Sequence, residues 1–238
     1  MTLDLRDRLV GRAAGLYRDS GLAAYYFARA KLRFDPFYSL LLADKLIPAD
    51  ARILDLGCAQ GLLAAWLHTA RRCYDEHHWD SAWPVPPTIR SYRGVDHNVA
   101  EIRRARQALG ECADFAVGDI SGEQLSGATV IVLLDVLHYI EYSIQLEMLS
   151  LIRATLPSDG KGLLRVGDAA AGAPACVSYC VDRLVVSARG GATTTLYRRP
   201  LSEWFSVLAD LGYTVHELAK QHSWAYSNTL LHLVPARS

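Results

Sequence analysis

The sequence lacks the cysteine pattern of a disulfide-stapled protein. Its five cysteines are an odd number and include no CxxC pair, whereas a disulfide framework uses paired cysteines at close spacings. We therefore expect a reducing compartment, and the cytoplasm fits best. The cysteines are Cys58, Cys73, Cys112, Cys176 and Cys180.

Long apolar runs are also missing. No stretch approaches the roughly 18 consecutive apolar residues that indicate a membrane span. Charged residues occur between Asp4 and Arg8, where a signal peptide would need its apolar segment. We therefore expect no membrane span and no export.

The chain has no net charge, because Lys and Arg total 25 and Asp and Glu also total 25. No excess of positive charge would attract a phosphate backbone, and we interpret the arginines at 183–199 as solvated surface. The acidic and His-containing run at residues 75–80 has no histidine pair at helical i, i+4 spacing. We therefore expect neither a nucleic-acid partner nor a metal.

After residue 50, short apolar runs alternate with longer amphipathic ones, which is typical of βαβ units in an α/β fold. This rhythm predicts a doubly wound, Rossmann-like sheet of seven strands. The predicted strands are residues 52–56, 93–96, 114–117, 129–133, 162–167, 214–218 and 229–233. The predicted helices are residues 62–72, 99–109, 144–155, 175–187 and 201–211.

Residues 1–50 have helical periodicity and form a predicted N-terminal helical cap on a catalytic domain at 51–238. Pro36 is expected to begin a new helix within this cap. A proline-rich, aromatic insertion at 73–91 interrupts the βα rhythm. Long loops often serve as lids, so this insertion is a candidate substrate wall, with surface decoration as the alternative.

A strand followed by a glycine turn occupies residues 53–61, Ile-Leu-Asp-Leu-Gly-Cys-Ala-Gln-Gly. Gly57 and Gly61 would supply unrestricted dihedrals and close approach of a ligand at the carboxyl end of the sheet. A dinucleotide turn would need a further glycine where Ala59 stands. The pattern favours a ligand without phosphates, whose ammonium group pairs with Asp55, and Cys58 and Ala59 join the site as turn residues.

Two later strand ends carry acids. Asp96, followed by His97, is placed to accept hydrogen bonds from both ribose hydroxyls. Asp119 could accept from an adenine amino group, and the next backbone N–H, that of Ile120, could reach a ring nitrogen. A lone Asp after a strand is usually a turn residue, but acids at three successive strand ends indicate a nucleoside site.

These motifs resemble the class I S-adenosylmethionine-dependent methyltransferase family. The resemblance spans residues 52–166 and includes Val-Ile-Val-Leu-Leu-Asp-Val-Leu-His-Tyr-Ile at 130–140 and Leu-Pro-Ser-Asp-Gly-Lys-Gly at 156–162. It implies S-adenosylmethionine as methyl donor, S-adenosylhomocysteine as product, and a mostly parallel sheet whose final strand is antiparallel. It also implies that Leu134 and Asp135 approach the cofactor through backbone atoms.

A narrower resemblance links residues 26–36 and the tryptophan-proline insertion to methyltransferases of bacterial aryl-polyene pigment gene clusters. It implies secondary metabolism and a small-molecule acceptor that is phenolic or linked to an acyl carrier protein. The candidate substrate-binding residues are Tyr25, Tyr26, Lys31, Arg33, Trp83 and Tyr139.

His138 is the candidate catalytic base, because a phenol with a pKa of about 10 is mostly protonated at neutral pH. A pocket-lining histidine is the alternative. Two other functions stay open. The chain could be a non-catalytic S-adenosylmethionine-binding module, or an NAD(P)-dependent oxidoreductase, which the missing middle glycine disfavours.

Overall fold

The computed structural model describes residues 4–172, 195–222 and 227–236. They fall into two compact units, one up to Glu123 and the other from Gln124 onward. The division into a cap at 1–50 and a catalytic domain at 51–238 stays a prediction. The N-terminal helices lie in the same compact unit as the first three strands.

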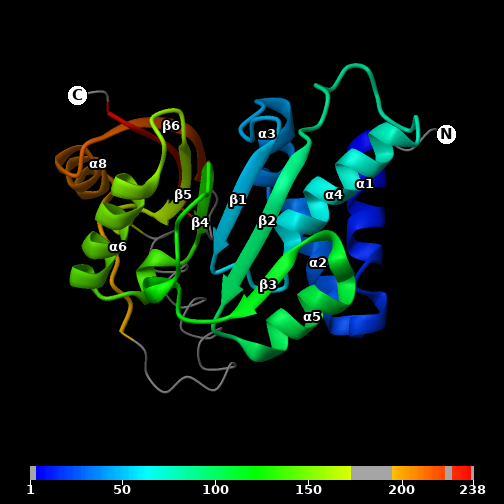
Figure 1. Ribbon diagram of the computed structural model, residues 1–238, viewed down its shortest axis with the longest axis horizontal. Helices are drawn as coiled ribbons and strands as arrows, with labels where there is room; N and C mark the ends of the chain where they lie inside the picture. Colours follow the sequence, from blue (N-terminus) through cyan, green and yellow to red (C-terminus); the bar gives the residue numbers. More distant parts are fainter. Residues whose placement is uncertain (1–3, 173–194, 223–226, 237–238) are drawn as a thin grey trace. The chain divides into compact units, whose positions relative to one another are not determined.

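The seven strands are ordered β3-β2-β1-β4-β5-β7-β6, and Figure 1 labels β1 to β3 of the first unit and β4 to β6 of the second. In the first unit β1 (Ala51–Leu56), β2 (Ile89–Asp96) and β3 (Asp114–Val117) pair in parallel. In the second unit β4 (Val130–Leu134) is parallel to β5 (Lys161–Gly167). The predicted mostly parallel sheet is confirmed, and so is its antiparallel final strand, because β7 (Ser227–Pro235) runs antiparallel to β5 and to β6 (Tyr213–His222).

The described part of the first unit contains five α-helices. They are α1 (Leu5–Gly15), α2 (Leu22–Phe34), α3 (Phe37–Ala43), α4 (Leu62–Asp75) and α5 (Val99–Leu109). Pro36 is the N-cap residue directly before α3, so a new helix begins at this proline as predicted, where the missing N–H donor costs no intrahelical hydrogen bond. Helix α1 packs against α2 and α4, and its residues Leu9 and Ala13 are buried, so the N-terminal helices pack onto α4 of this unit.

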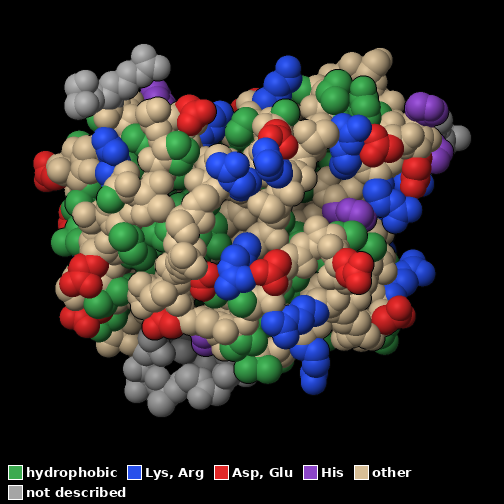
Figure 2. Space-filling view, viewed as in Figure 1, with side chains coloured by type: hydrophobic (Ala, Val, Ile, Leu, Met, Phe, Trp, Pro, Cys, Tyr) green, Lys and Arg blue, Asp and Glu red, His purple; other side chains and the backbone are tan. Residues whose placement is uncertain are grey.

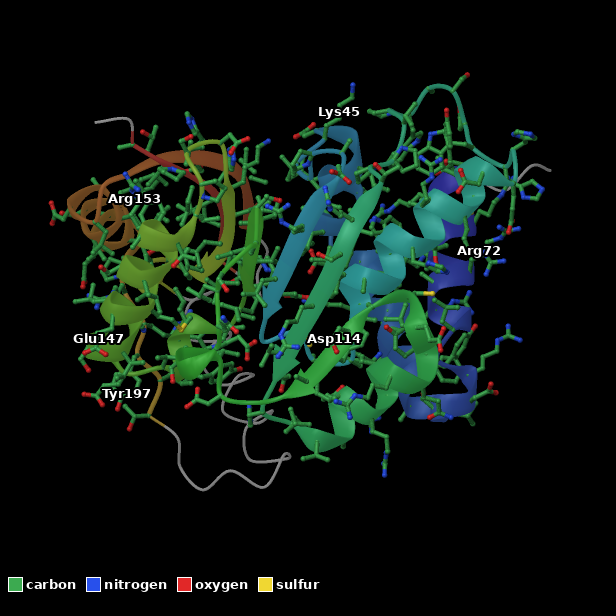
Figure 3. The ribbon with its side chains drawn as sticks, viewed as in Figure 1. Lys45, Arg72, Asp114, Glu147, Arg153 and Tyr197 are labelled. Carbon is green, nitrogen blue, oxygen red and sulfur yellow. The ribbon has the colours of Figure 1, made fainter. Side chains whose placement is uncertain are left out.

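The second unit contains α6 (Tyr142–Thr155) and α8 (Leu201–Asp210). Arg153 of α6, labelled in Figure 3, donates to the carbonyls of Gly212 and Ala236 at 2.7 and 2.9 Å. This arginine therefore ties α6 to the residue before β6 and to the residue after β7. The predicted helix at 175–187 lies outside the described residues. No helix in the described ranges has the length and apolarity that a membrane crossing requires.

Several predicted boundaries are wrong, most clearly around the insertion. Helix α4 continues to Asp75, since Cys73 is buried on its inner face and Arg71 pairs with Asp75 one turn later. Strand β2 begins at Ile89 rather than 93, because Ile89 already pairs with Ala51. The connecting segment is therefore residues 76–88, not 73–91.

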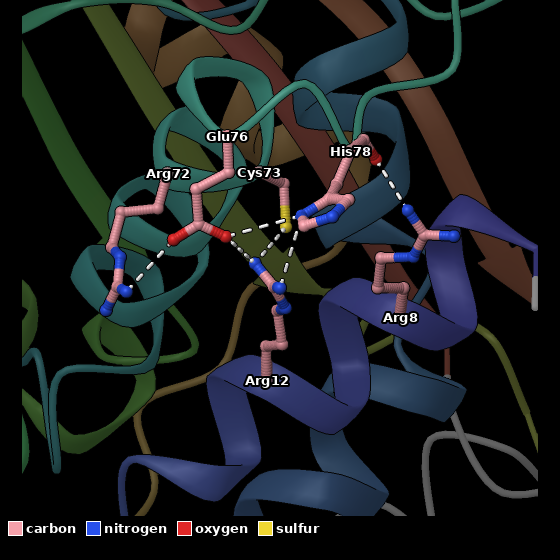
Figure 4. A network of polar contacts seen from close by, with 6 residues as sticks. All are labelled: Arg8, Arg12, Arg72, Cys73, Glu76 and His78. Atoms are coloured by element: carbon pink, nitrogen blue, oxygen red, sulfur yellow. Dashed lines mark hydrogen bonds and ion pairs between the residues drawn. The ribbon is translucent and has the colours of Figure 1, made fainter.

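The start of this connecting segment is fastened to α1 by a polar network (Figure 4). Arg12 pairs with Glu76 and donates to the Cys73 sulfur at 3.4 Å, while Arg8 donates to the His78 carbonyl at 2.9 Å. Arg72 also pairs with Glu76, and these partners lower the pKa of the Glu76 carboxyl to about 2, chiefly through the Arg12 hydrogen bond. The acidic and His-containing run thus begins with an ion-pair network that anchors it.

Charges of both signs are interspersed over the face shown in Figure 2. This distribution matches the balanced totals of 25 basic and 25 acidic residues, so the face presents no broad field of one sign.

Candidate functional site

The glycine turn is built from three residues in the left-handed region. Gly57, Ala59 and Gly61 have φ angles of 80, 48 and 77°. The N–H groups of Gly57 and Cys58 donate to the Val95 carbonyl at 2.8 and 3.2 Å. Alternate left-handed residues coil the backbone tightly between β1 and α4, at the carboxyl end of β1, where open parallel sheets bind ligands.

Gly61 is required for a different reason than close approach of a ligand. A Cβ at this position would lie 2.8 Å from the Phe115 ring and 3.2 Å from Leu109. It would also stand at φ +77°, which L side chains rarely adopt. The predicted need for unrestricted backbone dihedrals at Gly61 is therefore confirmed. The space beside Gly61 is filled by Phe115 of β3 and Leu109 of α5, not left open for a ligand.

Asp96 joins the end of β2 to the glycine turn. Its Oδ2 accepts from the Ala59 N–H and its Oδ1 accepts from the Asn98 N–H, both at 2.9 Å. The side chain is only 11% exposed. An ionised carboxylate has about four acceptor positions, so both oxygens keep capacity for a ligand's hydroxyls.

Ala59 occupies a conformation that glycine would adopt without strain, and it stands where a dinucleotide turn has its middle glycine. We predict that Ala59→Gly raises the free energy of unfolding by about 1 kcal/mol, because it removes the left-handed penalty. Urea denaturation measures this. Ala30→Gly, at an exposed position within α2, should instead lose about 1 kcal/mol, and a loss at both positions would contradict the strain argument.

Asp55 is buried at 4% exposure and accepts a hydrogen bond from the Tyr92 hydroxyl. Burial raises the pKa of its carboxyl to about 7, while the Tyr92 hydrogen bond opposes the shift and the charge of Asp96 adds to it. Sequence reasoning missed Tyr92, because only the parallel register of β1 and β2 brings it opposite this part of β1. Asp55 is thus poised to change charge near neutral pH.

The third acid, Asp119, follows the end of β3. The Gly118 N–H donates to the Asp96 carbonyl at 3.1 Å, which fixes the ends of β2 and β3 together. Asp119 is exposed and caps the short 3₁₀ turn Ile120–Gly122, accepting from the Ser121 N–H at 3.0 Å. That bond lowers the pKa of the Asp119 carboxyl. His97 lies beside Asp96 with its side chain 88% exposed.

Two residues that sequence reasoning missed connect the N-terminal helices to the glycine turn. The fully buried Tyr17 donates its hydroxyl to the Gln60 carbonyl at 2.8 Å. Gln60, 1% exposed, donates its amide to the Ala24 carbonyl of α2 at 3.3 Å. Through these two hydrogen bonds, the N-terminal helices help to hold the turn's shape. In the sequence, a polar residue inside the turn was the only indication of this contact.

The candidate substrate-binding residues on α2 differ in exposure and in the partners that they contact. Tyr25 is half-buried under the guanidinium of Arg18, 5.5 Å from its ring centroid, and Tyr26 is 59% exposed. Lys31 pairs with Asp35 at 3.0 Å, and Arg33 pairs with Asp7. Lys31 and Arg33 are thus engaged in ion pairs within the helical region, which weakens their case as anion ligands.

Trp83 is not placed with the other candidates. Its segment joins α4 to the start of β2, and therefore lies at the amino end of the parallel strands, whereas the glycine turn and Asp96 lie at the carboxyl end (Figure 1). The eight residues of β2 separate these two edges by roughly 25 Å. Trp83 accepts from the Trp79 indole through its carbonyl at 3.3 Å, which favours surface decoration over a substrate wall.

In the second unit, Asp135 follows β4 with φ +58° and forms a two-pronged ion pair with Arg165 of β5. Arg165 is 4% exposed, and Asn228 donates to the same carboxylate at 3.3 Å. The Asp135 N–H donates to the Arg165 carbonyl at 3.2 Å. Asp135 thus links the end of β4 to β5 and β7 through its side chain. The half-buried Leu134 before it is the last residue of β4.

His138 lies in the short 3₁₀ turn Leu137–Tyr139 with its ring 4.0 Å from that of Tyr139, centroid to centroid. Burial lowers the pKa of His138 to about 4, with Arg198 lowering it further and Asp135 opposing. The imidazole is therefore neutral at pH 7. It can accept a proton in that form, but a base of this strength removes a phenolic proton poorly.

Gln145 positions this turn, and sequence reasoning missed it. It is completely buried, and its amide donates to the carbonyls of Leu137, Ile140 and Tyr197 at 2.8 to 3.1 Å. Arg199 in turn donates to its carbonyl oxygen at 3.1 Å. The sequence could have indicated Gln145, because it is a polar residue on the buried face of α6, three, four and seven positions before Met148, Leu149 and Ile152.

Two further features of the described residues bear on chemistry. No three His, Cys, Asp or Glu side chains within them are grouped as a metal site. Cys58 and Cys73 are buried free thiols and Cys112 is an exposed one, whereas Cys176 and Cys180 lie outside the described ranges. Burial raises the pKa of the Cys58 thiol, and the nearby Asp55 and Asp96 raise it further, so Cys58 stays protonated.

Comparison with known proteins identifies the fold. Magnesium protoporphyrin IX methyltransferase of Synechocystis PCC 6803, solved with S-adenosylhomocysteine, is 16% identical with a TM-score of 0.58 over 98% of each chain. The chain has a class I methyltransferase fold. The YcgJ protein of Bacillus subtilis is 14% identical with a TM-score of 0.60, over 84% of this chain and 98% of that one.

A third similar structure is NcsB1, an O-methyltransferase from neocarzinostatin biosynthesis, in complex with S-adenosylmethionine and 2-hydroxy-5-methyl naphthoic acid. It is 19% identical with a TM-score of 0.55 over 92% of this chain, which spans 60% of its length. No protein-family model and no curated protein sequence matches this chain.

Proposed function

We propose that the chain is an S-adenosylmethionine-dependent methyltransferase acting on a small molecule. The observation that carries this proposal is Asp96, whose Oδ2 accepts from the Ala59 N–H of the glycine turn and whose Oδ1 accepts from the Asn98 N–H, with acceptor positions left on both oxygens. It is supported by the fold, which is shared with proteins solved with S-adenosylmethionine or S-adenosylhomocysteine.

The residues of the first unit fit this cofactor. Asp96 would accept from the ribose hydroxyls, and Asp119 with the Ile120 N–H would meet the adenine edge. Asp55, a carboxyl at the end of β1 with a pKa near 7, would pair in its ionised form with the amino-acid ammonium, directly or through water. Gly57, Cys58, Ala59 and Gly61 would form the floor of the site.

The bound donor would supply a methyl group on a good leaving group, so the protein's main task is to hold the acceptor close and aligned. His138 would contact the acceptor, and its neutral imidazole favours a pocket-lining role unless an anion nearby raises its basicity. Tyr139, whose ring is tilted by 48° against that of His138, would line the same region.

The acceptor is proposed to be aromatic or phenolic, or linked to an acyl carrier protein, as in secondary metabolism of the aryl-polyene kind. In favour of a phenol, the O-methyltransferase NcsB1 was solved with a hydroxylated naphthoic acid. On α2, the exposed Tyr26 and the half-buried Tyr25 remain candidates for binding the methyl acceptor. A cytoplasmic location is part of the same proposal.

The cofactor proposal is tested by calorimetry with S-adenosylhomocysteine. Wild type should bind it, and Asp96→Asn should bind about tenfold more weakly, because the variant loses a charged acceptor for the ribose. Asp114→Asn is the matched control, since Asp114 (labelled in Figure 3) begins β3 at the opposite end and pairs with Arg93. Equal affinities of both variants would contradict the ribose assignment.

Two competing functions predict different results. A nicotinamide-dependent oxidoreductase would bind NADH tightly and S-adenosylhomocysteine not at all. A non-catalytic module would bind S-adenosylhomocysteine but transfer no label from methyl-labelled donor to phenolic or carrier-bound acceptors, as followed by mass spectrometry. Methylated product would establish the enzyme.

A further inference from the structure

Helix α2 of the first unit has apolar side chains on two opposite sides. The helix packs against α1 and α4, and its buried residues are Ala24, Ala28 and Leu32. Four large apolar side chains on the same helix are exposed, at 75, 59, 48 and 77% for Leu22, Tyr26, Phe27 and Phe34. A surface helix of a globular protein normally presents polar residues to solvent, so the outer side of α2 has the composition of an interface.

The exposed apolar residues of α2 form a continuous stripe. Leu22 and Tyr26 are four positions apart, Phe27 and Phe34 are seven apart, and the exposed Ala30 lies between them. At 100° per residue these positions fall within an arc of roughly 140° opposite the buried residues. The stripe runs for about 18 Å along the helix axis, which is longer than a small aromatic molecule. A methyl acceptor could therefore cover only part of it.

Basic residues border this stripe on both sides. Arg29 and Arg33 are one turn apart along one edge, Lys31 lies at the other, and α2 contains no acidic residue. Lys31 and Arg33 are paired with Asp35 and Asp7. Arg29 is exposed and has no ion pair within the described ranges. The edge with Arg29 therefore offers an unbalanced positive charge beside the apolar stripe.

The charge of the surrounding segment has the same sign. Residues 4–35 contain seven basic and four acidic residues, although the whole chain is balanced. An apolar helix face that contains Leu and Phe and is bordered by Arg or Lys is typical of a helix lying in the headgroup region of a membrane. Tyrosine is also enriched at that interface. The positive excess complements the negative potential of anionic lipids.

Two other occupants fit the stripe less well. If two copies of the chain met through α2, the basic edges of the two helices would face each other, and like charges in contact disfavour association. A protein partner would need a groove shaped to one protruding helix face and lined with acid. A fluid lipid surface needs no such fit, since its headgroups rearrange around the inserted side chains.

We propose that α2 docks the protein on an anionic membrane surface. Leu22, Phe27 and Phe34 enter the boundary between headgroups and acyl chains, and Arg29 contacts the lipid phosphates. The opposite side of α2 keeps its packing against α1 and α4, so docking requires no unfolding. This inference goes beyond the methyltransferase function and does not depend on it.

Co-sedimentation of the full chain with lipid vesicles tests the proposal. The protein should bind vesicles of phosphatidylcholine mixed with phosphatidylglycerol, and binding should weaken several-fold on phosphatidylcholine alone or at high salt. Arg29→Gln should lose about fivefold on the anionic vesicles and nothing on the neutral ones. The comparison of the two lipids uses the wild type alone. No sedimentation with the anionic vesicles, or equal binding to both lipids, would overturn the proposal.

The role of the stripe is tested by Phe34→Ser, which should weaken binding about tenfold, because it removes the most exposed apolar side chain of α2. Leu151→Ser is the matched control, since Leu151 of α6 is also exposed, at 48%, and should change nothing. Equal losses in the two variants would overturn the assignment to α2. So would a wild-type dimer in gel filtration that Phe34→Ser converts to monomer, because a second copy would then occupy the stripe.

Discussion

Asp135→Ala is expected to lower the free energy of unfolding by about 3 kcal/mol, because it leaves the Arg165 guanidinium without the carboxylate that binds it in two places. Arg165 is 4% exposed and Asp135 30% exposed, so water can replace only part of this partner. Alanine at φ +58° adds a smaller penalty of about 1 kcal/mol. Urea denaturation followed by circular dichroism measures the loss.

Two matched variants separate the causes. Asp135→Asn keeps a residue that tolerates the left-handed region and an oxygen that accepts from Arg165, so it should lose about 1 kcal/mol. The double variant Asp135→Ala with Arg165→Met removes both charges and should recover most of the stability. If the double variant is as unstable as Asp135→Ala alone, the cost does not come from the guanidinium's loss of the Asp135 carboxylate.

Much of the fold could be predicted because hydrophobic periodicity and glycine placement are local signals. The helix at Val99–Leu109 and the strand at Asp114–Val117 begin and end where the pattern indicated, since Asn98 caps the helix with its own side chain. The long strands β6 and β7 were predicted too short. Their pairing with each other extends them, and pairing is a tertiary property.

The site could be predicted only in part, for a related reason. Single residues with unusual chemistry at strand ends, such as Asp96, are visible in the sequence. Their partners are not, because Tyr92 reaches Asp55 only through the parallel register, and Gln145 reaches Tyr197 across 52 residues. The position of Trp83 could have been inferred, since a segment between a helix and the next parallel strand returns to the amino edge of the sheet.

Binding of S-adenosylhomocysteine is expected to weaken roughly tenfold for each pH unit below about 7. Burial raises the pKa of Asp55 to about 7, so this carboxyl gains a proton as the pH falls below that value. The proposed ammonium partner needs the ionised form, and it must compete with that proton. Above pH 7 the affinity should be flat. Calorimetry between pH 5 and 8 would measure the profile.

Asp55→Asn should bind weakly and without this pH dependence, because it carries no titrating charge. Tyr92→Phe removes a donor that favours the ionised form, so the midpoint of its profile should move to higher pH. A wild-type affinity that does not change between pH 5 and 7 would contradict the assignment of Asp55.

Stability provides an independent measure of the same group. Because the folded pKa of Asp55 is raised, its contribution is fully present below the unfolded value of about 4 and is lost as the pH rises through about 7. Asp55→Asn should therefore gain stability relative to wild type between pH 5 and 8. If that gain appears while the variant keeps full affinity for S-adenosylhomocysteine, Asp55 is a buried structural carboxyl and the ammonium lies elsewhere.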